Sequence, residues 1–193
     1  MLLFSRLIRY RGTQQRKLEE RPAERLYQSI LQASRQPKLY TEFEVHDHLD
    51  SRFDMLCLHI SLLMGRLRML PEDVHKPLNQ ELFDRFFADM DFTLREMGVG
   101  DLGVGKRVRK MSEAFMGRLL AYTKSLERND KMELALVLAR NIRRSHDSND
   151  ADRRMADYVL QSRDRLSAVG DNEMQAGTVD LVAILALHGD SHG

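Results

Sequence analysis

The stretch LDSRFDMLCLHISLLMGRLR, residues 49–68, decides the fold of this chain. Most of its apolar residues recur every three or four positions, which is the spacing of one face of an α-helix. The residues at this spacing are Phe53, Leu56, Cys57, Ile60, Leu63, Met64 and Leu67. Met55, Leu58 and Leu62 widen the stripe beyond one face, as is typical of a helix surrounded by others. We predict a central helix over residues 50–70, with the Asp50 side chain as its N-cap.

Helical spacing continues on both sides of this stretch, and no segment alternates apolar and polar residues as a half-buried strand would. Pro71 and Pro77 are expected to bracket a linker, because proline disfavours helix at and before its own position. The glycine-rich residues 98–105 are expected to form a loop. Further helices are predicted over residues 23–36, 78–97, 104–127, 131–143 and 150–167. The predicted fold is therefore all-α, a single-domain bundle of about six helices with no sheet.

The predicted helix over residues 78–97 carries the largest apolar side chains. Its inward stripe is Phe83, Phe86, Phe87, Met90, Leu94 and Met97. Because aromatic side chains bury large areas, this stripe is expected to dominate the core, and Phe87→Ala to cost about 3–5 kcal/mol.

Both ends of the chain are predicted to lie outside the main helical domain, which spans residues 22–168. Residues 1–21 combine apolar side chains with arginines and carry no acid before Glu19, which predicts a basic amphipathic segment, with contact to an anionic membrane as one interpretation. A transit peptide or an unstructured end are the alternatives. Residues 169–193 are predicted to be a tail whose stretch TVDLVAILALHG, residues 178–189, forms a short docking helix. That stretch is too short to cross a bilayer.

Composition and motifs argue against catalysis. The net charge of +1 gives no overall attraction to nucleic acid, so no DNA partner is expected. Residues 98–103 match GxGxxG, but a dinucleotide site requires a preceding strand that is not predicted here. The acid- and histidine-rich residues 44–50 are expected to form a polar loop, with a metal site as the alternative. We therefore expect no catalytic residue, no cofactor and no metal, and the chain is not predicted to be an enzyme.

Four cations, Lys106, Arg107, Arg109 and Lys110, fall near the start of the predicted helix 104–127. Positive charge is unfavourable at a helix N-terminus, so local stability does not explain them. They indicate an anionic partner, which could be a membrane surface, an RNA backbone or an acidic protein face. A solvated face paired to nearby acids is the alternative.

Residues 49–68 and residues 82–119, LFDRFFADMDFTLREMGVGDLGVGKRVRKMSEAFMGRL, together resemble the ubiquinol-cytochrome c chaperone family. The resemblance spans residues 26–158 and includes RQPKLY at 35–40. The matching signature residues are Asp47, Asp50, Arg52, Phe53, Asp54, Asp89, Asp91, Arg95, Glu96, Gly98, Gly100, Asp101, Gly105 and Lys106. Two positions depart from the family pattern, with His46 in place of a proline and Ser51 in place of a glycine.

The resemblance implies a helical, non-catalytic assembly factor for the respiratory bc1 complex that binds newly made cytochrome b. Mitochondrial relatives also associate with the ribosome. Charged residues concentrated in two segments suggest one partner-binding face built from residues 47–54 and 89–106, joined by the basic cluster. The predicted partner-binding residues are Asp47, Asp50, Arg52, Asp54, Asp89, Asp91, Arg95, Glu96, Asp101, Lys106, Arg107, Arg109 and Lys110.

The leading hypothesis is an assembly chaperone that binds newly made cytochrome b by protein–protein contact, without nucleotide. The second is a ribosome- or RNA-binding module that uses residues 106–110, and the third is a helical-bundle metalloenzyme or haem binder. Little sequence precedes the family region, so we expect a cytoplasmic protein, peripheral on the cytoplasmic face of the inner membrane. The mitochondrial matrix is the alternative location.

Overall fold

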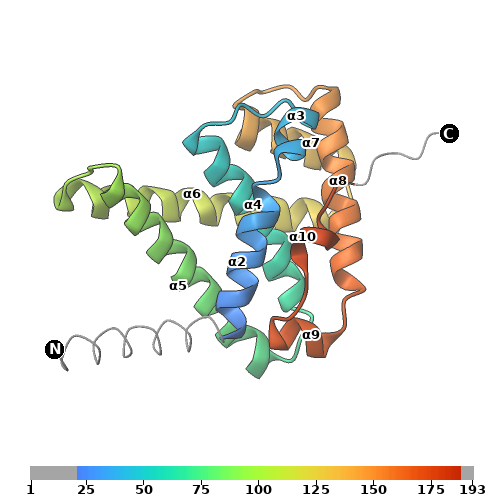
Figure 1. Ribbon diagram of the computed structural model, residues 1–193. Coiled ribbons are helices and arrows are strands. Elements are labelled where there is room, and N and C mark those ends of the chain that lie inside the picture. Colours follow the sequence, from blue (N-terminus) through green and yellow to red (C-terminus); the bar gives the residue numbers. More distant parts are fainter. Residues whose placement is uncertain (1–20, 188–193) are drawn as a thin grey trace.

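A computed structural model describes residues 21–187, apart from the side chain of Leu102, and within that range the chain is helical with no strand (Figure 1). Its helices are α2 (Pro22–Ser34), α3 (Pro37–Glu42), α4 (Leu49–Leu67), α5 (Glu72–Glu96), α6 (Asp101–Arg128), α7 (Lys131–Leu138), the π-helical turn η1 (Ala139–Arg143), α8 (Asp150–Ser167), α9 (Asp171–Ala176) and α10 (Leu181–Ile184). Six of these described helices have seven or more residues. The predicted all-α class is confirmed. The basic amphipathic segment predicted for residues 1–21 lies outside the described residues, except for Arg21.

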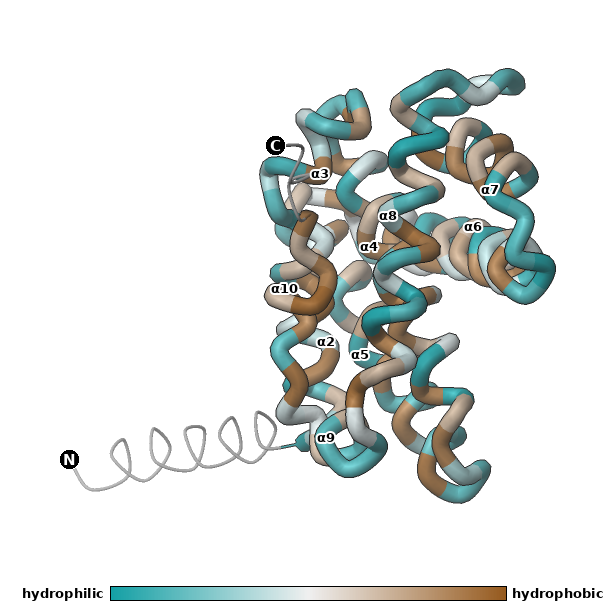
Figure 2. The backbone as a smooth tube through the Cα atoms, turned by 90° about the vertical axis from the view of Figure 1, so that its right-hand side faces the viewer, coloured by the Kyte–Doolittle hydropathy of each residue, from teal (hydrophilic) through white to brown (hydrophobic). Residues whose placement is uncertain are grey.

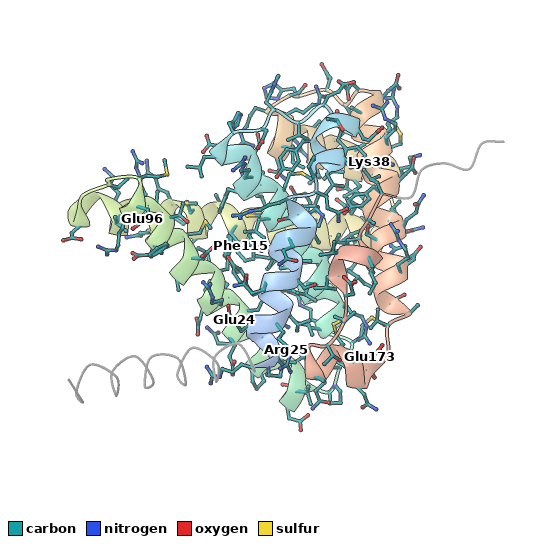
Figure 3. The ribbon with its side chains drawn as sticks, in the orientation of Figure 1. Glu24, Arg25, Lys38, Glu96, Phe115 and Glu173 are labelled. Carbon is teal, nitrogen blue, oxygen red and sulfur yellow. The ribbon has the colours of Figure 1, made fainter. Side chains whose placement is uncertain are left out.

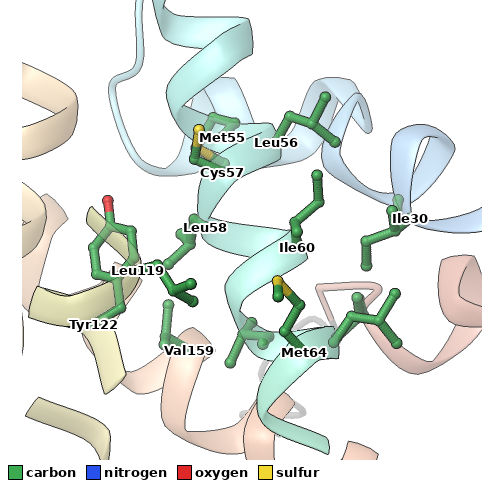
Figure 4. Close-up of a cluster of buried hydrophobic side chains, with 14 of the residues drawn as sticks. Ile30, Met55, Leu56, Cys57, Leu58, Ile60, Met64, Leu119, Tyr122 and Val159 are labelled. Atoms are coloured by element: carbon green, nitrogen blue, oxygen red, sulfur yellow. The ribbon is translucent and has the colours of Figure 1, made fainter. Parts of the chain in front are cut away.

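Helix α4 is the centre of the bundle, as its sequence predicts. It packs against α2, α5, α6 and α8, and every residue from 54 to 64 is buried. Figure 4 shows Met55, Ile60 and Met64 of α4 among Ile30 from α2, Leu119 from α6 and Val159 from α8. Cys57 lies in the same core and is buried.

The start of α4 differs from the prediction. The N-cap is His48, whose Nδ1 accepts a hydrogen bond from the Ser51 backbone N–H at 3.2 Å. The predicted cap, Asp50, lies inside the first turn. An acid there still interacts favourably with the helix dipole. The sequence therefore located the start of the helix, but placed the N-cap two residues too late.

The linker predicted between Pro71 and Pro77 is wrong, because α5 begins at Glu72 and continues through Pro77. A proline removes one N–H from the helix, and here the lost bond would have reached back only to the Asp73 carbonyl. Val74 and His75 both donate to the Pro71 carbonyl, at 3.0 and 2.9 Å, so the first turn is closed before the proline is reached.

The loop predicted over residues 98–105 is shorter than expected, because α6 begins at Asp101 with Gly100 as its N-cap. Only Gly98 requires glycine for its backbone, with φ at +79°. As a result α5 and α6 form a long helical hairpin whose corner projects from the body of the protein (Figure 1). Of the apolar stripe predicted to face the core from α5, Phe83 and Phe87 are only partly buried, and Met97 is exposed.

The C-terminal tail packs onto the same core. Met174, Leu181 and Leu185 are buried, and the Leu181 N–H donates to Ser29 Oγ of α2 at 3.0 Å. Gly177 has φ at +66°, and a Cβ there would lie 2.5 Å from the Pro22 carbonyl oxygen, so only glycine permits this approach. Figure 2 shows the apolar α10 segment lying beside α2.

A buried histidine links the central helix to this tail. His59 Nδ1 lies 2.7 Å from the Met55 carbonyl oxygen, and Nε2 lies 2.8 Å from the Tyr158 hydroxyl. That hydroxyl is also 3.0 Å from the Leu185 carbonyl oxygen. Because His59 is fully buried, loss of solvation lowers its pKa to about 4.

We expect acid to destabilise the fold through His59. In the unfolded chain a histidine gains its proton near pH 6.5, whereas the pKa in the folded state is about 4. The contribution of neutral His59 to the free energy of unfolding is therefore fully present above pH 6.5 and is lost as the pH falls toward 4. At about pH 4.5 the loss is about 2–3 kcal/mol.

Urea unfolding of the wild-type chain and His59→Asn at about pH 7 and about pH 4.5 measures this contribution. The wild-type chain should lose more stability on acidification than the variant. Asp54 responds in the opposite sense, because burial raises its pKa, but it is present in both proteins and cancels. Equal losses in the two proteins would contradict the prediction.

Candidate functional site

A groove lies between the start of α4, the end of α5 and the first half of α6, and we call it the α4–α6 groove. Its volume is about 640 Å³. Figure 1 shows the elements that enclose it, the N-terminal end of α4 and the projecting α5–α6 hairpin. The apolar part of its lining is Leu49, Phe53, Leu56, Met90, Leu94, Met111 and Ala114. Segments that are far apart in sequence, around residues 50 and 92, therefore meet at one concave surface.

Cations surround this apolar lining. Those that line the groove are Arg35, Arg52, Arg107, Lys110, Arg118 and Arg144, against a single lining carboxylate, Asp50. Within residues 21–187 the side chains of Arg35, Arg107 and Lys110 make no hydrogen bond or ion pair. A concave surface lined by one sign of charge concentrates the electric field and attracts groups of the opposite sign.

Asp54 lies beneath the groove and holds two of these arginines. The residue is 1% exposed, and its carboxylate forms ion pairs of 2.7 Å with Arg118 Nη2 and 2.7 Å with Arg144 Nη2. Arg118 also lies over the Phe53 ring, 5.6 Å from its centroid. Burial raises the pKa of Asp54, and the two guanidinium groups oppose that shift. Asp54 therefore positions the cations and is itself too buried to contact a partner.

Asp47 and Arg52 form an exposed pair beside the groove. Arg52 donates from Nε to Asp47 Oδ1 at 2.6 Å and from Nη2 to Oδ2 at 3.0 Å. These hydrogen bonds lower the pKa of Asp47 below its usual value. Asp50, in the first turn of α4, lines the groove and is exposed. Asp47, Asp50 and Arg52 therefore lie at the surface, and their role in partner binding stays a prediction.

Asp91, Arg95 and Asp101 hold the α5–α6 corner together. Arg95 Nε donates to Asp91 Oδ2 at 2.6 Å, and Arg95 also pairs with Asp101 at the first residue of α6. The arginine therefore bridges the last turn of one helix and the first turn of the next. Glu96 is exposed at the same corner, where Figure 3 labels it. These signature residues have a structural role in the hairpin and remain accessible.

Asp89 lies apart from the groove. It accepts a hydrogen bond from the Tyr27 hydroxyl at 2.8 Å and lies 3.5 Å from Arg85 Nη1. Arg85 pairs in turn with Glu24 of α2 at 2.8 Å. The structure therefore places Asp89 in a network that fastens α2 to α5, away from the other predicted residues.

The basic cluster is divided between two faces of α6. Arg107 and Lys110 line the groove, whereas Lys106 and Arg109 are exposed and do not line it. Arg109 pairs with Glu113 at 3.1 Å. Because α6 begins at Asp101, the cluster lies in its second and third turns, so the expected conflict with the helix dipole is wrong.

Three cations of the groove were missed from sequence, namely Arg35, Arg118 and Arg144. Arg118 had a usable signal, because residues 107, 111, 114 and 118 share one face of a helix. Arg35 follows the end of α2, and Arg144 has φ at +59° directly after the π-helical turn. Neither position can be related to the groove by periodicity.

In the part of the chain that the structure describes, no group of three or more His, Cys, Asp or Glu side chains is placed to hold a metal ion. None of the helices there is both long enough and apolar enough to span a membrane.

Comparison with known proteins places these features in context. A family model described as ubiquinol-cytochrome C chaperone matches residues 41–182. The structure is similar to the crystal structure of the Cbp3 homolog from Brucella abortus, with 38% sequence identity and a TM-score of 0.75. That match covers 93% of this chain and 95% of the other. A comparison with curated proteins found no match.

Proposed function

The chain belongs to the ubiquinol-cytochrome c chaperone family and so is a bc1 assembly chaperone, and on that premise we propose that it binds newly made cytochrome b in the α4–α6 groove. The binding is by protein–protein contact, without catalysis. One observation carries the proposal: residues 49–56 of α4 and residues 90–94 of α5, far apart in sequence, meet at a single apolar groove with cations around it.

The groove suits a client that is not yet assembled. A membrane protein exposes apolar segments before they are buried, and a chaperone needs an apolar surface to receive them. Met90 and Met111 contribute flexible side chains that adapt to different partners. Phe92 and Met97 extend exposed apolar surface onto the α5–α6 corner beside the groove.

Charge reversal within the basic cluster tests the proposal. Arg107→Glu/Lys110→Glu places two acids in the groove lining and is expected to lower co-purification of cytochrome b by about tenfold or more. The measurement is the amount of cytochrome b recovered with the tagged full chain from cells, together with the amount of mature bc1 complex.

Lys106→Glu/Arg109→Glu is the matched control, because it reverses the same number of charges on the same turns of α6 outside the groove. Its cytochrome b recovery should stay within about twofold of wild type. An equal loss in both variants would show that general charge matters and not the groove. Loss of ribosome co-sedimentation in the control variant would instead support the ribosome-binding hypothesis.

A further inference from the structure

We infer that the α4–α6 groove recognises a carboxylate on an apolar segment of its protein partner, with Arg107, Lys110 and Arg118 as the recognising cations. The inference rests on the proposed function and names the chemistry that the groove selects. The occupant is an amphipathic peptide segment that carries Asp or Glu beside its apolar side chains.

The charge of the groove points to an acid. Six cations line it against one carboxylate, and the buried Asp54 is already shared by Arg118 and Arg144. Asp47 is already paired to Arg52. Within the described residues this leaves Arg35, Arg107 and Lys110 with no acidic partner, and Arg107 and Lys110 are like-charged neighbours three residues apart on α6. An incoming carboxylate relieves that repulsion.

Arg118 is built to receive such a group. Its side chain is only 13% exposed, and it is fixed by Asp54, by the Phe53 ring and by a hydrogen bond from Nη1 to the Ala114 carbonyl at 3.1 Å. Its Nε is buried and has no hydrogen-bond partner among the described residues. A guanidinium held in one orientation loses little conformational entropy when a carboxylate binds.

The rest of the lining favours a peptide over other anions. The floor is aliphatic and thioether side chains, and its one aromatic ring, Phe53, is covered by Arg118. Single-stranded RNA would need open aromatic faces on which bases stack. A volume of about 640 Å³ accommodates several side chains of a helix together with their acidic neighbour.

The test uses fluorescent amphipathic helical peptides that differ at two positions, both Glu in one, both Gln in the second and both Lys in the third. The wild-type full chain should bind the Glu peptide about tenfold more tightly than the Gln peptide, with a preference that weakens as salt rises. Arg107→Gln/Lys110→Gln should weaken the preference, because only Arg118 of the three recognising cations remains, and Arg107→Glu/Lys110→Glu should shift it to the Lys peptide. Lys106→Gln/Arg109→Gln should leave it unchanged.

Equal binding of the Glu and Gln peptides by the wild-type chain would overturn this inference. The inference would also be overturned if anionic phosphatidylglycerol vesicles displaced the Glu peptide from the chain while the Gln peptide stayed bound. Displacement of the Glu peptide alone by a single-stranded RNA would have the same meaning. The proposed function fails separately, if cytochrome b does not co-purify with the wild-type chain. Circular dichroism of each variant confirms that the helical fold is retained.

Discussion

Replacing Phe86 with alanine is expected to lower the free energy of unfolding by about 3–5 kcal/mol. Phe86 is fully buried on α5, where its ring centroid lies 5.2 Å from that of Phe115 on α6, 4.8 Å from Phe87 and 5.9 Å from Phe53 on α4. Truncation removes the contacts that the Phe86 ring makes with residues of α4, α5 and α6. It also leaves a cavity that the packed helices cannot close. Urea unfolding of the purified chain measures the loss.

Phe87→Ala is the matched control, because it removes the same side chain from the next position of the same helix. Phe87 is only partly buried, so its loss should be clearly smaller than that of Phe86. Phe92→Ala should change stability little, since that side chain is 61% exposed. If Phe87→Ala destabilises the chain as much as Phe86→Ala, the sequence-based expectation that Phe87 is a full member of the core was correct.

Helices with clear local signals were predicted well from sequence. Helix α8 spans Asp150–Ser167 as predicted, and its start is fixed by a capping box between Asn149 and Asp152. Errors arose where a local rule was overridden by neighbouring turns, as at Pro77 within α5 and at the glycines that begin α6. Gly and Pro raise the free energy of a helix by only a few kcal/mol, which packing of a long hairpin can offset.

The candidate site was predictable only in part. The sequence brought residues 47–54 and 89–106 together through a family resemblance, but Met90, Thr93 and Leu94 line the groove from the second segment and its predicted charged residues do not. It could not separate Asp89, which fastens α2 to α5, from acids at the surface. Nor could it distinguish Asp47 from Asp54, which are the same residue type in one segment, although Asp47 precedes α4 at the surface and Asp54 is buried within it.

That difference makes Asp54→Ala the second substitution with a large expected effect, a loss of about 3–4 kcal/mol in the free energy of unfolding. The variant leaves Arg118, which is 13% exposed, without its only counter-ion among the described residues. Arg144 is half exposed and can regain water, so most of the loss comes from Arg118. Urea unfolding measures the change.

Two comparisons decide whether the buried charge is the cause. Asp47→Ala breaks an exposed pair with Arg52 and should leave stability nearly unchanged. Asp54→Ala/Arg118→Met removes the stranded cation as well and should recover part of the loss, because an apolar side chain replaces an unpaired charge. If the double variant were no more stable than Asp54→Ala, the loss would come from packing at position 54 and not from Arg118. In that case Asp54 would not be the residue that positions the cations of the groove.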